Sequence, residues 1–150
     1  MTPEEFTKLV EKKASEIVQL HNRTLPIKAG VIAEAHFKDN FIKGGFVNGG
    51  LQKWVPSKRL SSTAKSADKK NKTLLSSSPH LFSEVNHIPS EGEVRIINTV
   101  PYAAVHNEGL RAGRGSGFTM PKRQFIGESK ELTDKIQNLI ETEITKILNS

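Results

Sequence analysis

Apolar residues recur at steps of three and four near both ends of the chain, which is the pattern of helices with one apolar face. The N-terminal stripe consists of Phe6, Leu9, Val10, Ala14, Ile17 and Leu20. Thr2 is placed to cap this helix, Pro3 suits its first position, and Glu5 completes a capping box. We therefore expect a helix from Pro3, which Pro26 stops before a second helical segment opens.

Two further helices follow from the same spacing. The second segment carries the stripe Ala29, Ile32, Ala33, Phe37 and Phe41. The last helix is expected from Glu128, with the stripe Leu132, Ile136, Leu139, Ile140, Ile144, Ile147 and Leu148. Each stripe predicts one face that packs against the rest of the protein.

The middle of the chain reads as strands and turns. Ser83–Ile88 and Glu93–Val100 are predicted strands, and the turn residues 89–92 between them favour an antiparallel hairpin. Tyr102–Asn107 is expected to form a short helical turn that Gly109 closes. Residues 109–117 contain four glycines and are expected to be a loop.

These elements predict one α+β domain over residues 1–150: an antiparallel sheet built on the central hairpin and packed by the N-terminal and C-terminal helices. The length suits a single core. No apolar run approaches the roughly 18 residues of a membrane span, and the first residues lack the layout of a signal peptide. The chain has no cysteine, which excludes disulfides, thiol nucleophiles and cysteine-bound zinc.

The positive charge is concentrated in one segment. The chain has a formal net charge of +6, and residues 53–73 hold one acidic residue, Asp68, against seven basic ones. The basic residues are Lys53, Lys58, Arg59, Lys65, Lys69, Lys70 and Lys72. Residues 61–73 contain no large apolar side chain, so we expect a mobile basic loop over about residues 55–73. Such a loop is compatible with solvent exposure, an acidic protein surface or nucleic-acid phosphates, but Trp54 at its edge gives little support for base stacking.

The sequence offers no convincing catalytic, metal or cofactor site. His106 and Glu108 lie two residues apart, which does not fit the four-residue spacing of a helical zinc pair. The glycine-rich segment 109–117 neither follows a buried strand nor ends in the Gly-Lys-Ser/Thr of a phosphate loop. We therefore expect a protein that is not an enzyme and needs no cofactor. A hydrolase at the His106/Glu108 corner is the enzymatic alternative.

Two motifs in fixed order distinguish the second half of the chain. Residues 100–109 read V-P-Y-A-A-V-H-N-E-G, and residues 120–127 read M-P-K-R-Q-F-I-G. Upstream stand Gly44-Gly45-Phe46, Trp54 and the basic segment. This order resembles the virion-morphogenesis, or tail-completion, family of tailed bacteriophages and Mu-like prophages, over roughly residues 36–148.

The resemblance implies a structural protein of phage or prophage assembly that completes the tail or joins head and tail at the neck. Its partners would be other tail or neck proteins, and it would act as a homo-oligomeric ring. It would be found in the bacterial host cytoplasm during assembly and in the virion afterwards. The alternative is a small basic nucleic-acid-binding protein that uses residues 53–73.

The motifs supply the expected assembly residues, which are Tyr102, His106, Gly109, Pro121, Arg123 and Phe125. Tyr102 is expected to lie over the end of the hairpin, with His106 on the same side of the helical turn. Pro121 and Phe125 are expected to redirect the chain and anchor the last helix. Arg123 is expected to form a fixed bidentate ion pair.

Overall fold

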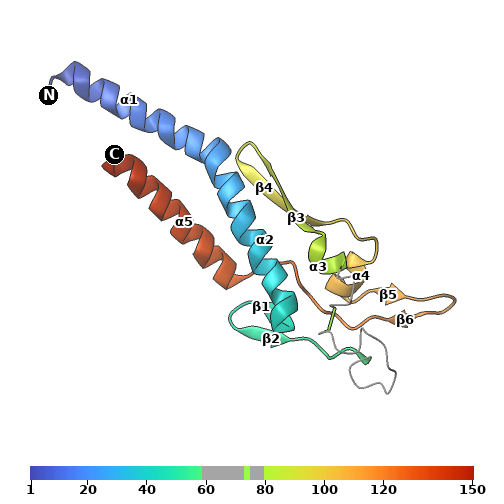
Figure 1. The fold of residues 1–150 in the computed structure, drawn as a ribbon. Helices are drawn as coiled ribbons and strands as arrows, with labels where there is room; N and C mark the ends of the chain where they lie inside the picture. Colours follow the sequence, from blue (N-terminus) through green and yellow to red (C-terminus); the bar gives the residue numbers. More distant parts are fainter. Residues whose placement is uncertain (59–72, 75–79) are drawn as a thin grey trace.

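The computed structural model describes residues 1–58, 73–74 and 80–150 (Figure 1). The elements in chain order are α1 (Pro3–Gln19), the π-helical segment η1 (Leu20–Thr24), α2 (Leu25–Lys43), β1 (Gly45–Val47), β2 (Leu51–Lys53), α3 (His80–Ser83), β3 (Val85–Ser90), β4 (Glu93–Asn98), α4 (Ala103–Glu108), β5 (Arg111–Ala112), β6 (Phe118–Thr119) and α5 (Lys130–Asn149). The predicted α+β class is confirmed. None of the described helices is long and apolar enough to cross a membrane.

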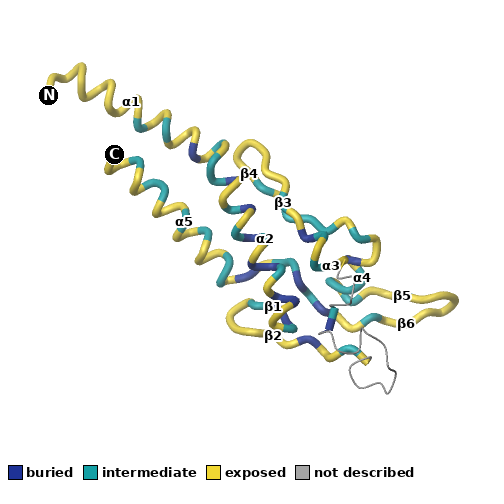
Figure 2. Tube along the Cα trace, viewed as in Figure 1, coloured by how far each residue is buried: buried dark blue, intermediate teal, exposed yellow. Residues whose placement is uncertain are grey.

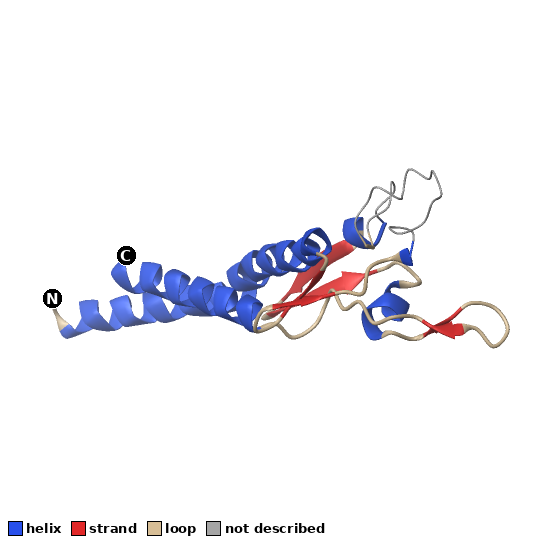
Figure 3. Cartoon of the chain, turned by 90° about the horizontal axis from the view of Figure 1, so that it is seen from below, coloured by secondary structure: helices blue, strands red, loops and turns tan. Residues whose placement is uncertain are grey.

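The molecule is elongated, with helices at one end and short hairpins at the other (Figures 1 and 3). Helices α1 and α5 run side by side and bring both termini to the same end. We call this pair the helical arm. Neither of its helices contains a buried residue, whereas α2 buries one face along much of its length (Figure 2).

Helix α1 begins as expected, with the Thr2 side chain accepting from the Glu5 N–H and the Glu5 carboxylate accepting from the Thr2 N–H. The expected stop at Pro26 is wrong, because η1 carries the helix into α2 without a break. In the wider turn the Leu25 N–H bonds to the Leu20 carbonyl, five residues back. A proline removes the bond to the carbonyl four residues back. That carbonyl, of Asn22, instead accepts from Gly92 N at the tip of the β3–β4 hairpin, at 3.2 Å.

The predicted central hairpin is confirmed as the antiparallel pair β3–β4, which packs against α2. Its boundaries differ from the prediction, since Ser83 ends α3 and the first strand continues through Pro89 to Ser90. Proline is tolerated in an edge strand, because its missing N–H leaves no inner neighbour unpaired. The turn is therefore only Glu91-Gly92, where Gly92 adopts the left-handed φ of 74°.

Two other hairpins were not expected. Strands β1 and β2 pair across the glycines at positions 49 and 50, and β5 pairs with β6 inside and just beyond the segment predicted as loop. The loop prediction for residues 109–117 is thus wrong in part, because Arg111 and Ala112 are strand residues. The described strands form three separate two-stranded units rather than one sheet.

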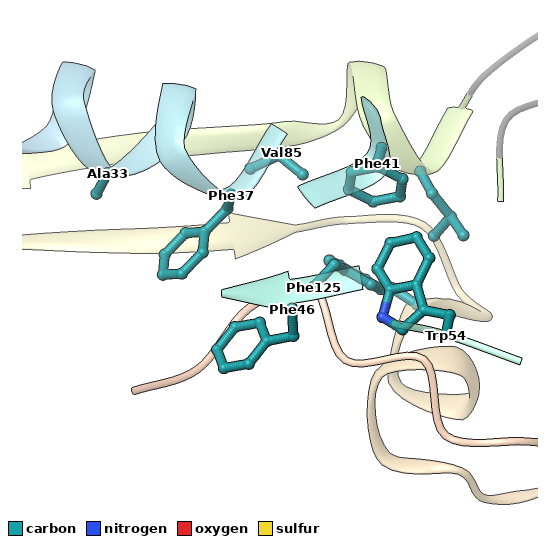
Figure 4. Close-up of a cluster of buried hydrophobic side chains, with 9 residues drawn as sticks. Ala33, Phe37, Phe41, Phe46, Trp54, Val85 and Phe125 are labelled. Atoms are coloured by element: carbon teal, nitrogen blue, oxygen red, sulfur yellow. The ribbon is translucent and has the colours of Figure 1, made fainter. Parts of the chain in front are cut away.

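The core lies where α2 meets the hairpins and the segment before α5 (Figure 4). Phe41 is completely buried and packs edge-on against Trp54 and Phe82, with Phe125 5.0 Å away between ring centres. The other buried apolar members are Ala33, Phe37, Phe46, Leu81, Val85 and Ala103. Edge-to-face packing of this kind adds to the stabilisation from area burial.

Candidate assembly site

The two sequence motifs lie against each other and form one unit. We call residues 100–109 the corner and residues 120–127 the strap. The backbone N–H of Arg123 donates to the backbone carbonyl of His106, with 2.8 Å between the nitrogen and the oxygen. The Asn107 Oδ1 accepts from the N–H groups of Phe125 and Ile126, at 2.9 and 3.0 Å, and its Nδ2 donates to the Ile126 carbonyl. The order of the motifs in the sequence therefore has a structural cause, because each satisfies backbone groups of the other.

The strap is also bonded to the body of the protein. Trp54 Nε1 donates to the Gln124 carbonyl at 2.8 Å, and Asn40 Nδ2 donates to the Phe125 carbonyl at 2.9 Å. The Phe125 side chain is 1% exposed within the core. The strap thus anchors the start of α5, as predicted for Phe125. Pro121, at the outer end of the strap, is exposed.

Arg123 is fixed inside the protein. Only 7% of the residue is exposed, and its Nε and Nη2 donate to the carbonyl oxygens of Val55 and Pro56 at 2.8 and 3.3 Å. The Arg123 guanidinium is therefore held in place and shielded from solvent, as the sequence predicted. The bidentate ion pair stays a prediction.

Gly109 closes α4 as predicted, in the left-handed conformation with φ of 69°. A Cβ at this position would also lie 2.9 Å from the Lys122 Cβ in the strap. Glycine is needed here for both reasons, since any side chain would strain the backbone and push the strap away.

Tyr102 and His106 share one side of α4, as the sequence predicted. Their rings meet edge-on with centres 5.9 Å apart, and Tyr102 is 45% exposed. Burial and then the nearby Arg123 lower the pKa of His106, so the ring is neutral near pH 7. Its Nδ1 is buried without a hydrogen bond in the described part of the chain. Tyr102 therefore offers the accessible surface of the corner, and His106 supports its ring.

A buried polar cluster at the base of the helical arm was not predicted from the sequence. His36 Nε2 lies 3.0 Å from the Ser129 Oγ, and Lys135 Nζ lies 3.0 Å from His36 Nδ1. A serine beside a histidine is a possible nucleophile. Here, however, the Ser129 hydroxyl donates to the Val47 carbonyl at 2.5 Å and caps α5 by accepting from the Leu132 N–H. The group therefore joins α2, α5 and β1.

Acid is expected to destabilise the protein partly through His36. Its pKa is lowered by burial first and then by the Lys135 and Lys43 charges, so below about pH 6.5 the unfolded chain binds a proton that the folded chain resists. Stability is thus intact above about pH 6.5 and falls as the pH drops towards the folded pKa. Denaturant unfolding at several pH values should show this slope, and His36→Asn should reduce it.

The exposed His80 supplies the control for that measurement. His80→Asn is expected to keep the slope of the parent protein. An unchanged slope in His36→Asn would contradict the assignment.

A sequence model of the phage virion morphogenesis family matches residues 49–145, about two thirds of the chain. The chain belongs to the phage virion morphogenesis family. The family indicates a structural role in virion assembly, which agrees with the resemblance of the motifs. Neither the curated proteins nor the solved structures compared with the chain give a significant match.

The family match includes the corner, the strap and most of α5, whereas α1, η1 and α2 precede it. The match therefore covers the unit that the hydrogen bonds identify as one structure. Within residues 1–58, 73–74 and 80–150 there is no group of three or more His, Cys, Asp or Glu side chains that could hold a metal ion.

Of the predicted basic loop of this morphogenesis protein, Lys53 and Lys58 lie in the described part, both exposed. Arg59, Lys65, Lys69, Lys70 and Lys72 lie outside the described residues. Ser57 and Thr73 lie next to each other, because Ser57 N donates to Thr73 Oγ1 at 3.0 Å. The preceding residues Val55 and Pro56 contact the strap through their hydrogen bonds from Arg123. Arg111, Arg114 and Lys122 are exposed in or beside the β5–β6 hairpin. Positive charge thus gathers at the hairpin end of the molecule.

Proposed function

We propose that this virion morphogenesis protein completes the tail or joins it to the head, acting through protein–protein contacts in a ring. The family supports an assembly role. The observation that carries the finer proposal is the exposed apolar surface on the β5–β6 hairpin. Phe118 is 56% exposed and Leu110 46%, on a hairpin that projects from the body (Figure 1).

The hairpin is well suited to a protein contact. A Cβ on Gly113 would lie 3.1 Å from the Phe118 ring, so the ring lies directly over the Gly113 backbone. Aromatic and arginine side chains are enriched at protein interfaces. Arg111 and Arg114 on the same hairpin favour an acidic partner surface.

The ring in this proposal rests on an argument from symmetry. Subunits that repeat around a symmetric axis make the same contact with each neighbour, and a head-to-tail contact that closes gives a ring. The two ends of this molecule differ in secondary structure, which suits a contact between unlike surfaces (Figure 3).

Phe118→Ala tests this role in a phage or prophage that encodes the protein. Because Phe118 is exposed, the purified variant should keep the unfolding temperature of the parent. We expect the infectious titre to fall at least about tenfold, as interface aromatic residues often contribute more than 1.4 kcal/mol. Electron microscopy of the lysate should show unjoined heads and incomplete tails.

Ile88→Ala is the matched control, since Ile88 is 50% exposed on the β3–β4 hairpin. It should leave both titre and particle structure unchanged. Normal particles from Phe118→Ala would overturn the hairpin as the assembly contact.

Nucleic-acid binding is the second candidate, favoured by the exposed basic residues at the hairpin end. Lys53, Arg111, Arg114 and Lys122 would contact phosphates, and such binding weakens steeply as salt rises. Tight binding to duplex DNA at low salt, lost in Arg111→Ala/Arg114→Ala, would favour this function. DNA binding that is equally weak in both proteins would exclude it.

A further inference from the structure

The first turns of α1 extend past the end of α5. Lys13 Nζ donates to the Ile147 carbonyl and to the Ser150 Oγ, each at 2.6 Å, which places Lys13 beside the last turn of α5. Every residue from Met1 to Lys12 is exposed (Figure 2). The segment Pro3–Lys12, which we call the projecting helix, therefore has no covering element among the described residues.

The projecting helix has an apolar face that is left in solvent. Phe6, Leu9 and Val10 are 58%, 39% and 50% exposed and lie at helical spacing on one side. Most of the stability of helices in proteins comes from the packing of an apolar face, and this end of α1 has no such packing among the described residues. An intermolecular contact would supply that packing.

The charges beside this face identify the partner as a second copy of the chain. Glu5 and Lys12 lie seven residues apart, which is two turns, on the same flank of the apolar face. When two such helices pack antiparallel about a two-fold axis, Glu5 of each faces Lys12 of the other. A parallel pair would instead bring opposite flanks together, so Glu5 and Lys12 would not meet, and it would also align the two helix dipoles unfavourably.

We propose that the projecting helices of two protomers pair antiparallel, with Phe6, Leu9 and Val10 at the centre and two Glu5–Lys12 ion pairs along one edge. Both charged groups are accessible for this. Glu5 uses Oε2 for the capping box, at 2.7 Å from the Thr2 N. The Lys12 side chain is 69% exposed, and its Nζ lies 3.9 Å from Glu16.

The pairing is expected to be weak. Two helices of this length bury less than the roughly 1,200 Å² that stable protein interfaces reach. Leu148 is 60% exposed in the last turn of α5. The C-terminal end of α5 lies at the same end of the molecule as the projecting helix (Figure 1), so Leu148 would extend the contact. The dimer leaves the β5–β6 hairpin open, so it does not depend on the proposed function.

Charge exchange between the two positions tests the pairing directly. Glu5→Lys and Lys12→Glu each replace two attractive contacts with two repulsive ones, so each should weaken self-association in sedimentation equilibrium by at least about tenfold. An equimolar mixture of the two variants should associate as the parent does, because every Lys then faces a Glu. The double variant Glu5→Lys/Lys12→Glu should also associate like the parent.

Controls separate the pairing from helix stability. Glu5→Gln keeps an acceptor for the Thr2 N–H, so it tests the charge with the capping box retained. It should weaken association less than Glu5→Lys. Circular dichroism should show unchanged helix content in Lys12→Glu, which leaves the cap intact.

Three results would overturn the proposal: a monomeric parent protein at millimolar concentration, unchanged association of both single variants, or failure of the mixture to associate more strongly than either variant alone. Phe118→Ala should not affect this equilibrium. Failure of the tail-assembly role would therefore leave the pairing intact, and the reverse also holds.

Discussion

Replacing Phe125 by alanine is expected to lower the free energy of unfolding by about 3–5 kcal/mol. The side chain is 1% exposed and packs against Phe41, so its removal leaves a cavity in the core as well as removing buried apolar area. The loss should also loosen the strap and the start of α5, because Phe125 belongs to the strap and lies five residues before Lys130, where α5 begins. Chemical denaturation followed by circular dichroism measures the change.

Phe118→Ala is the matched control, because it removes the same group from a residue that is 56% exposed. It should change the free energy of unfolding by less than about 1 kcal/mol. A similarly small loss in Phe125→Ala would contradict the core position of that ring. Since Phe125 cannot reach a partner, any assembly defect of its variant should follow from instability.

Asn107→Ala is expected to destabilise the protein by about 2–4 kcal/mol, since one truncation leaves two backbone N–H groups without their acceptor. Those N–H groups belong to Phe125 and Ile126, and the Nδ2 bond to the Ile126 carbonyl is lost as well. The corner and strap would then be held mainly by the Arg123 N–H bond to the His106 carbonyl. A lower unfolding temperature would show that the variant is less stable, and denaturant unfolding measures how far its free energy of unfolding falls.

Asn86→Ala removes the same side chain from an exposed position on β3, where Nδ2 donates to the Glu84 carbonyl at 3.2 Å. Its effect should stay within about 0.5 kcal/mol. If Asn107→Ala were equally mild, the side chain of Asn107 would not be what joins the two motifs.

Features with a local cause could be predicted from the sequence. The capping box at Thr2 and Glu5 fixes the start of α1, and the glycine at position 109 fixes the end of α4. The central hairpin could be predicted because its apolar residues flank turn residues. The resemblance of the corner and the strap to the family could also be found in the sequence, because each motif is a short, continuous run of residues.

Features that depend on distant residues could not be predicted. Strands β5 and β6 have two residues each, too few to show a period, and their pairing rests on glycines that also suit a loop. The contact of His36 with Ser129 spans 93 positions. Asn107 stood in the predicted helical turn, but its bonds to the strap require the chain to return 18 residues later. The hydrogen bond from Gly92 N to the Asn22 carbonyl, which Pro26 leaves without a donor, likewise involves a hairpin distant in the sequence.

The η1 segment also sets the direction in which the apolar face of α1 points. A π-helical turn contains one residue more than an α-helical turn would, and each residue of an α-helix advances the side chains by about 100°. Deleting one residue between Leu20 and Thr24 would therefore rotate the whole of α1 about its axis relative to α2 by roughly that angle. Lys13 would leave the end of α5, and Phe6 would point to a different side of the arm. A single-codon insertion or deletion in this segment is thus a route by which related proteins could acquire different oligomeric partners with no change in the hairpin end.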